Sequence, residues 1–142
     1  MATTDSIIVD DRPGALANYP HARRVGDLLF VSGISCRQPD DSHVGVQVDD
    51  DGTIHRDIAV QTEAVIDNIS AILQAAGGSL EDLVDLTVFL IDMSDYDGFN
   101  AVYDQYFDSE TGPARTTVAV SELPHPNLAI EIKALAHLDD QR

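Results

Sequence analysis

The chain has 142 residues, of which 44% are hydrophobic and 23% charged, a composition typical of one globular domain that spans residues 1–142. Eight Lys and Arg against 25 Asp and Glu give a net charge of −17, which disfavours binding to nucleic acid and to anionic membranes. No apolar run is long enough to span a membrane, and Met1–Asp5 lacks the basic and apolar blocks of a signal peptide. We therefore expect a cytoplasmic protein.

Cysteine and histidine usage excludes two further kinds of site. The chain has one cysteine, Cys36, so an internal disulfide is excluded. The five histidines show no close metal-ligand spacing such as HExxH. The sequence therefore predicts no metal site.

The N-terminal part of the chain predicts three strands. The first is the short apolar run Ser6–Val9. The runs Ala22–Val25 and Leu28–Ile34 are separated by a Gly-Asp turn and form a predicted hairpin. The polar residues 36–45 that follow are expected to form a loop.

A second hairpin is predicted from Val46–Val48 and Thr53–His55, which flank three consecutive aspartates and Gly52. The acidic run resembles half of a calcium-binding loop. However, Gln47 and Ile58 occupy the first and twelfth positions, where such a loop needs oxygen ligands. A turn is the better interpretation.

The clearest predicted helix runs from Asp57 to Ala76. Its apolar residues recur at spacings of three and four and form one stripe: Val65, Ile66, Ile69, Ile72, Leu73 and Ala76. Asp57 is the predicted N-cap, and two glycines end the helix. Residues 79–82 are expected to form one short turn.

The C-terminal half predicts three more strands and a second helix. The apolar run Leu83–Ile91 is the first of these strands, and Thr116–Val120 and Leu128–His137 are the other two. Ser94 to Asp97 resembles a capping box that opens a helix to about Phe107. The tyrosines and phenylalanine at positions 96, 99, 103 and 106 are expected on one face of that helix.

Leaving the second hairpin aside, the predicted order is β-β-β-α-β-α-β-β, which indicates an α+β fold in which two helices cover one face of a mixed sheet. Along Leu83–Ile91, the apolar residues Leu86 and Val88 alternate with Thr87 and Phe89, so both faces of the sheet carry apolar side chains. A second copy of the chain is the expected cover for the face that the helices leave open.

Two residues predict chemistry near the C-terminus. Arg115 lies in the segment Gly112–Val118, and Glu131 lies sixteen residues further along, on the next predicted strand. An arginine can bind the carboxylate of a ligand with two parallel hydrogen bonds. A glutamate carboxylate can position a water molecule or transfer a proton. The pair therefore suggests a site where a small carboxylic acid undergoes acid–base chemistry. Two structural interpretations are the alternatives to such a site. In one, Arg115 pairs with an acidic residue at a strand end; in the other, Glu131 is solvated or contacts Lys133 on the same strand face.

The sequence resembles the Rid (YjgF) family over nearly its whole length. The residues that carry the resemblance are Val25–Gly33, Gln61 and Asn68 on the first helix, Thr87–Leu90, Phe99–Phe107, Pro113–Arg115 and Ile130–Ala134. The runs Tyr19–Gly26, Ser32–Ser35 and Arg37–Asp40 are similar to the branch of the family that deaminates 2-aminomuconate in aromatic catabolism. The resemblance implies a chorismate-mutase-like fold and a homotrimer, or a hexamer, with clefts between subunits and catalysis without a metal or cofactor.

The resemblance also implies roles for individual residues. Arg115 corresponds to the carboxylate-binding arginine and Glu131 to the water-positioning glutamate, while Tyr19 corresponds to a pocket tyrosine and Thr117 to a position where cysteine is common. One of Arg23, Arg24 and Arg37, or else His21, is expected to bind the distal carboxylate of a diacid. Arg23 and Arg24 are adjacent on a strand and point to opposite faces, so at most one enters a given pocket. The remaining predicted site residues are Ser32, Gly33, Phe89 and Asn100.

The expected activity is hydrolysis of a C–N bond, which converts 2-aminomuconate into 4-oxalocrotonate and ammonia. Two alternatives are a broad enamine and imine deaminase that acts on 2-aminoacrylate, and a trimer that binds a small carboxylate without turnover. Ribonuclease activity is disfavoured by the acidic charge.

Overall fold

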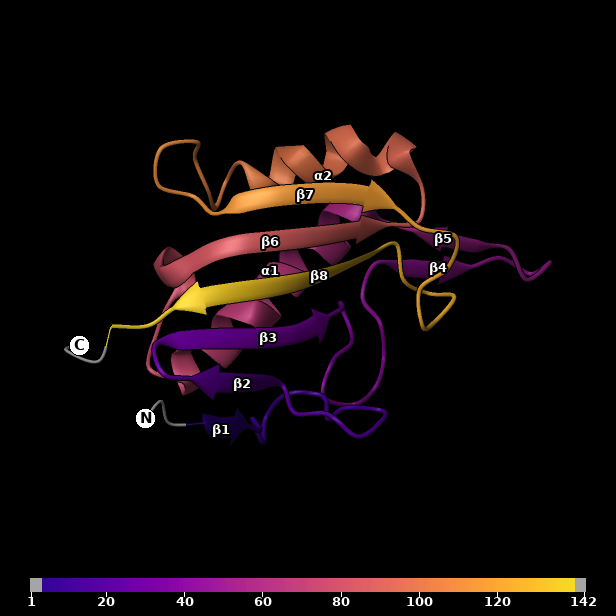
Figure 1. Cartoon of the computed structure of the whole chain (residues 1–142). Helices are drawn as coiled ribbons and strands as arrows, with labels where there is room; N and C mark the ends of the chain where they lie inside the picture. Colours follow the sequence, from indigo (N-terminus) through magenta and orange to yellow (C-terminus); the bar gives the residue numbers. More distant parts are fainter. Residues whose placement is uncertain (1–3, 140–142) are drawn as a thin grey trace.

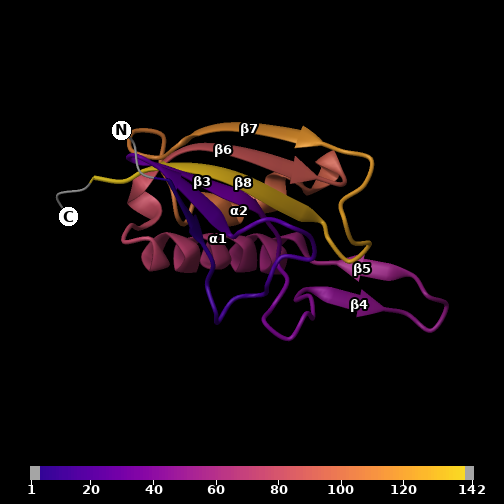
Figure 2. The same cartoon turned by 60° about the horizontal axis from the view of Figure 1, so that its bottom comes forward.

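A computed structural model describes residues 4–139 and arranges them as one mixed sheet with two helices on one face (Figures 1 and 2). The sequence of Met1–Asp5 shows no signal-peptide features. Residues 1–3 of that segment lie outside the described part of the chain. The α+β architecture predicted from the sequence is confirmed. None of the helices in residues 4–139 is long and apolar enough to cross a membrane.

The sheet has six strands in the order β1-β2-β3-β8-β6-β7. Their bounds are β1 Thr4–Ile7, β2 Ala22–Val25, β3 Leu28–Ile34, β6 Leu83–Leu90, β7 Ala114–Ala119 and β8 Ile130–His137. Only β6 and β7 pair in parallel; the other neighbours are antiparallel. Strands β4 (Val46–Val48) and β5 (Ile54–Arg56) form a separate hairpin that projects from one end (Figure 2).

Helix α1 (Ile58–Ala75) forms where the apolar stripe predicts it. The side chain of Asp57 caps it by accepting a hydrogen bond from the backbone N–H of Val60, and Gly77 ends it at a φ of +89°. Val65, Ile69 and the other stripe residues up to Leu73 are buried against the sheet. The predicted short turn after it is the 3₁₀ helix η1 (Leu80–Asp82).

The second helix differs from its prediction at both ends. Asp92, rather than Ser94, accepts the capping hydrogen bond, and it caps the 3₁₀ turn η2 (Met93–Asp95). Helix α2 then runs over Tyr96–Tyr103, and Asp95 makes no side-chain cap bond. The chain beyond Tyr103 continues in turns towards Phe107: Gln105 and Tyr106 bond to the third residue back, although Phe107 still bonds to Tyr103, the fourth residue back. The predicted capping box and the helix end at Phe107 are therefore wrong.

The two faces of the sheet differ in cover. Leu86, Val88 and Leu90 of β6 are buried beneath the helices. The opposite face is apolar but open in the single chain: Phe30, Val84 and Val118 are about two-fifths exposed, at 41%, 43% and 38%. The prediction of a sheet that is apolar on both faces is confirmed, and the open face has the character of an assembly surface.

Candidate functional site

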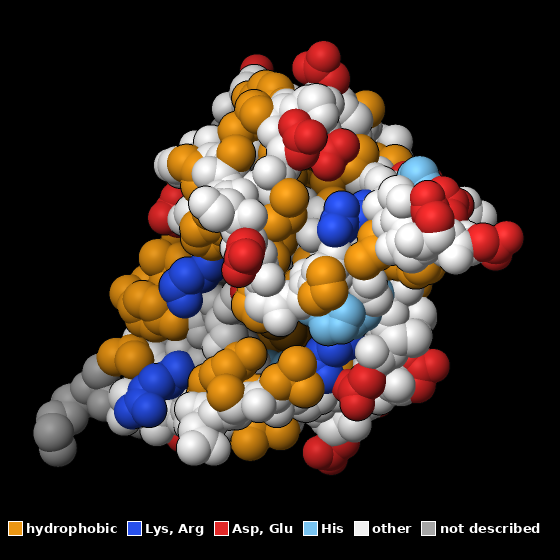
Figure 3. Space-filling model, turned by 90° about the vertical axis from the view of Figure 1, so that its right-hand side faces the viewer, with side chains coloured by type: hydrophobic (Ala, Val, Ile, Leu, Met, Phe, Trp, Pro, Cys, Tyr) orange, Lys and Arg blue, Asp and Glu red, His pale blue; other side chains and the backbone are white. Residues whose placement is uncertain are grey.

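A pocket of about 100 Å³ lies beside β3, between the loop that precedes β2 and the loop that precedes β8. Six of the predicted site residues line it: Tyr19, His21, Ser32, Gly33, Arg37 and Glu131. One face of the molecule is hollowed where histidine and Lys or Arg side chains gather, with acidic side chains around them (Figure 3). Arg12 and Arg37 both line this pocket, although the protein as a whole is acidic.

Glu131 sits on β8, and its carboxylate lies directly over Gly33 of the neighbouring strand β3. A Cβ at Gly33 would overlap Oε1 of Glu131, so glycine is what leaves room for the carboxylate. Burial raises the pKa of Glu131 above its ordinary value. Within residues 4–139 no cation or hydrogen-bond donor contacts this carboxylate. The alternative of a Glu131–Lys133 ion pair is therefore not observed. An unpaired, half-buried carboxylate is suited to hold a water and to carry a proton.

The loop that precedes β2 forms one wall of the pocket and is held by β3. The hydroxyl of Ser32 donates to the carbonyl of Pro20 at 2.8 Å, and its backbone N–H donates to the carbonyl of His21 at 2.9 Å. Tyr19, in contrast, is 51% exposed at the pocket mouth. Ser32 therefore positions the wall, whereas Tyr19 is accessible to a ligand.

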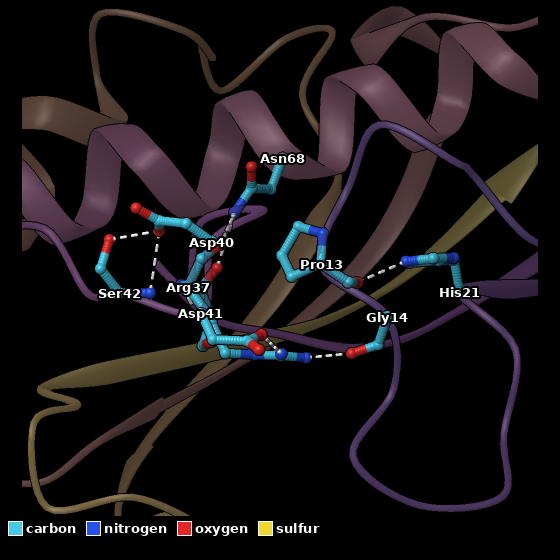
Figure 4. Close-up of polar contacts among 9 residues, drawn as sticks. Pro13, Gly14, His21, Arg37, Asp40, Asp41, Ser42 and Asn68 are labelled. Atoms are coloured by element: carbon cyan, nitrogen blue, oxygen red, sulfur yellow. Dashed lines mark hydrogen bonds and ion pairs between the residues drawn. The ribbon is translucent and has the colours of Figure 1, made fainter.

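His21 braces this loop with both ring nitrogens. Its Nδ1 accepts from the backbone N–H of Val9 at 3.0 Å, which leaves Nε2 to donate to the carbonyl of Pro13 at 2.7 Å (Figure 4). Both partners are satisfied only by the neutral ring with its proton on Nε2. Both ring nitrogens of His21 are therefore engaged within this loop, and substrate binding by His21 stays a prediction.

The guanidinium of Arg37 lines the pocket but is already engaged. It donates to the carboxylate of Asp41 and to the carbonyl of Gly14 (Figure 4). Its side chain is only 14% exposed. Arg37 therefore ties the loop 36–45 to the loop that precedes β2, and it adds positive charge to the wall.

Arg23 and Arg24 lie on β2 and do not line the pocket. Arg23 pairs with the exposed Phe30 and Arg24 with the buried Leu29, so the two arginines point to opposite faces, as predicted. Arg24 donates to the carbonyl of Gly26 at 2.9 Å.

Arg115 lies on the other side of the sheet from Glu131. On β7 it pairs with Leu86, whose side chain faces the helices. Its guanidinium packs over the rings of Phe99 and Tyr103 at 5.0 and 4.6 Å and donates to the hydroxyl of Tyr96 at 3.2 Å. No carboxylate is recorded against Arg115 within the described residues, so it does not form the structural ion pair considered as an alternative.

Three further predicted residues lie on β7, β6 and α2. Thr117 faces the same way as Arg115, and its buried hydroxyl has no hydrogen-bond partner in residues 4–139. Phe89 pairs with both Glu131 and Val118, and therefore lies on the open face. Asn100 is on α2, outside the pocket.

The structure does not bring Arg115 and Glu131 together within one chain. Strands β7 and β8 are consecutive in the sequence, but β6 lies between them in the sheet. Arg115 and Glu131 also point to opposite faces. A single chain consequently presents two half-sites, one with the guanidinium and one with the carboxylate.

Sequence reasoning missed several residues of the pocket wall. Arg12, His43 and His125 line the pocket, and Asn68 and Asn127 hydrogen-bond to members of this group. They come from separate loops and from α1, so no local motif connects them. The signal available in the sequence was weak: two histidines and an arginine in loops of a chain with few cations. Within the described residues, no group of three or more His, Cys, Asp or Glu is placed to hold a metal ion.

Comparison with known proteins places the chain in a family. The family profile described as Endoribonuclease L-PSP matches residues 9–138. A RutC family protein of Pyrococcus horikoshii is 40% identical over 131 residues, which are 92% of this chain and 95% of that protein. The 3-aminoacrylate deaminase RutC of Acinetobacter baylyi is 37% identical over 134 residues, which are 93% of this chain and 96% of the relative.

Solved structures agree with this placement. The crystal structure of the yeast protein YEO7 is 35% identical, with a TM-score of 0.83, and the match covers 96% of this chain and all of that one. The YjgF gene product of E. coli is 31% identical, with a TM-score of 0.76 and coverage of 94% and 98%. The chain therefore belongs to the Endoribonuclease L-PSP family, which is the Rid/YjgF family.

Proposed function

We propose that this protein is a hydrolytic deaminase of enamine and imine acids, and that its substrate is the six-carbon diacid 2-aminomuconate. The observation that carries the proposal is the half-buried, unpaired carboxylate of Glu131 over Gly33, in a pocket with a cationic wall. The relative from Acinetobacter baylyi, named for deamination of 3-aminoacrylate, supports the reaction class.

In the proposed reaction, the enamine first becomes an imine when a proton moves to carbon. Water held by Glu131 adds to the imine carbon and forms a C–O bond, while its proton passes to the carboxylate. Glu131 then returns the proton to nitrogen, which gives a carbinolamine. Glu131 next transfers the hydroxyl proton of this intermediate to the nitrogen, the C=O bond forms as the C–N bond breaks, and ammonia leaves with both bonding electrons. The products are the 2-oxo diacid and ammonia. A raised pKa suits Glu131 to this exchange, and such a group contributes about 10²–10⁴ in rate.

The guanidinium of Arg115 is proposed to bind the carboxylate next to the reacting carbon. It would fix that carbon against the water and draw electrons from it. Because Arg115 and Glu131 lie on opposite faces of one chain, the proposal requires them to come from different copies. The orphaned hydroxyl of Thr117 beside Arg115 and the open apolar face of the sheet support a shared site in a homotrimer.

The test is release of ammonia from freshly generated 2-aminomuconate by the purified protein. Arg115→Ala is expected to abolish turnover while the protein stays folded. Near-full activity of this variant would refute its role. The absence of ammonia release, together with tight binding of 2-oxo acids, would indicate a non-catalytic binding protein instead.

A broad deaminase is the second candidate, because the Acinetobacter baylyi relative is named for a three-carbon monoacid. Parallel kinetics on 2-aminomuconate and 2-aminoacrylate separate the two. A specific diacid enzyme has a much higher kcat/KM for the diacid, whereas a broad one treats both alike. The family description also names an endoribonuclease, so the purified protein should be incubated with RNA as well. The net charge of −17 predicts that the RNA is not cleaved.

A further inference from the structure

We propose that Arg12, His43 and His125 form a subsite that binds a second carboxylate of the substrate. The inference rests on the proposed deaminase function and names residues for the diacid specificity. All three residues line the same pocket as Glu131. They replace Arg23 and Arg24, which the sequence suggested for this role and which lie outside the pocket.

Arg12 lines the pocket and has guanidinium N–H donors that are not used within the described residues. Its Nη1 donates to Oδ1 of Asn68 at 3.1 Å, while its Nε is buried without a hydrogen-bond partner in the described residues. The nearest recorded carboxylate, on Asp11, is 3.9 Å from Nε and mostly exposed to water. The side chain as a whole is 28% exposed, and a ligand carboxylate in the pocket would supply acceptors for the guanidinium donors that remain accessible.

The two histidines are oriented by one asparagine. The backbone N–H of Asn127 donates to Nδ1 of His125 at 3.0 Å, and its side-chain amide lies 3.3 Å from Nδ1 of His43. In each ring Nδ1 is then the acceptor, so the neutral ring carries its proton on Nε2. Neither Nε2 has a recorded partner in residues 4–139. The two rings are tilted by 35° with their centroids 4.4 Å apart, so each brings an N–H donor to the same part of the wall.

Two acidic residues of the loop 36–45, Asp40 and Asp41, are already engaged. Asp41 accepts from Arg37, and Asp40 accepts from the N–H and hydroxyl of Ser42 at 3.0 and 2.6 Å (Figure 4). They therefore do not compete for Arg12 or for the histidines. Burial, together with His125 and Arg37, lowers the pKa of His43, while Asp41 acts against this shift. Two imidazole N–H donors beside one guanidinium match the two oxygens and the single charge of a carboxylate.

Helix α1 holds the wall in place before any ligand arrives. Asn68 donates to the carbonyls of Ser35 and Arg37 at 3.0 and 3.2 Å while it accepts from Arg12. The fully buried Gln61 donates to the carbonyl of Asn127 at 2.9 Å. The donors are therefore attached to a rigid element, which reduces the ordering cost of binding.

The first test measures binding without turnover. Muconate is the six-carbon diacid without nitrogen, and sorbate is the same carbon chain with a methyl group in place of one carboxylate. In titration calorimetry, wild-type protein is expected to bind muconate about 10- to 100-fold more tightly than sorbate. Arg12→Gln should lower muconate affinity to that of sorbate and leave sorbate binding unchanged. Equal affinity of the wild type for both acids overturns the subsite.

Controls separate the subsite from general charge and from misfolding. Lys133→Gln removes the same charge from an exposed residue of β8 outside the pocket and should leave the preference for muconate unchanged. If Lys133→Gln also lost the preference for muconate over sorbate, that preference would be a long-range effect of charge, and the proposal would be overturned. Should Arg12→Gln fail to fold, His125→Phe keeps a ring but removes the donor. It should weaken muconate binding about tenfold, and an unchanged affinity overturns the subsite.

Turnover distinguishes the two proposals. If muconate binds preferentially but 2-aminomuconate releases no ammonia, the subsite stands and the deaminase proposal falls. If 2-aminomuconate is deaminated but muconate and sorbate bind equally, the deaminase proposal stands and the subsite falls.

Discussion

The two halves of the candidate site contrast in what surrounds their charge. Arg115, on the helix face of β7, rests on aromatic rings and has no recorded carboxylate partner among residues 4–139. Glu131, on the opposite face, lies over a glycine in a pocket whose loops are tied together by hydrogen bonds. One half is an unpaired cation at the edge of the sheet, and the other is an unpaired anion in a pocket.

This contrast teaches that the fold keeps the two charges apart within one chain. Side by side they would form an ion pair, which would lower the pKa of Glu131 and occupy the fork of Arg115. Separated by β6 and by the thickness of the sheet, each remains available to a ligand. Four predictions test or sharpen this comparison, from the largest effect to the smallest.

Glu131→Gln removes the proton-carrying group and keeps the side-chain shape. We expect kcat to fall by about 10²–10⁴, measured as ammonia release from 2-aminomuconate. Binding of muconate should change little, because the amide still fits over Gly33. Activity close to wild type would place the chemistry elsewhere.

Arg115→Lys tests the other half, because it keeps the charge but loses the planar fork that lies on the rings of Phe99 and Tyr103. We expect kcat/KM to fall by about 10², since a lysine holds a carboxylate as a point charge without fixing its orientation. Full activity in the lysine variant would mean that orientation by Arg115 is unimportant.

Gly33→Ala places a methyl group where Oε1 of Glu131 now lies, so the carboxylate must move. We expect kcat to fall about tenfold, because small displacements of catalytic groups are costly. Gly14→Ala is the matched control: its added Cβ meets no heavy atom within 4 Å, and activity should be unchanged. Equal activities of the two variants would contradict the role of close packing at Gly33.

The smallest expected effect is on stability. Burial raises the pKa of Glu131 above its ordinary 4.5, so its contribution to folding is most favourable below pH 4.5 and is lost as pH rises through the folded-state pKa. Glu131→Gln should therefore be more stable than wild type at pH 7, and this gain should shrink towards pH 4. Urea unfolding across this range measures the difference. Glu110→Gln, at an exposed position, should show no such trend.

Periodicity and turn residues were sufficient to predict most of the fold. The stripe of α1, the hairpin of β2 and β3, and the two apolar faces of the sheet are all local patterns, and all were confirmed. Helix α2 was predicted too long because its aromatic spacing continues to Tyr106, whereas the backbone beyond Tyr103 forms turns.

The site was less predictable because it depends on strand order. Insertion of β6 between β7 and β8 separates Arg115 from Glu131, and no spacing in the sequence indicates this. Similarly, the subsite wall joins Arg12, His43 and His125 through Asn68 and Asn127, which are distant in sequence. The types of side chain suggested the chemistry, but only the tertiary packing determines which of these side chains lie next to one another.

A complementation assay tests most directly whether two copies share one site. Arg115→Ala and Glu131→Gln are each expected to be inactive. If each site takes its arginine from one copy and its glutamate from a neighbour, random reassembly of a 1:1 mixture regenerates about a quarter of the sites. The account predicts about 25% of wild-type ammonia release after mixing and reassembly, with the unmixed variants inactive. No recovery in mixed assemblies of verified composition would contradict a site shared between copies.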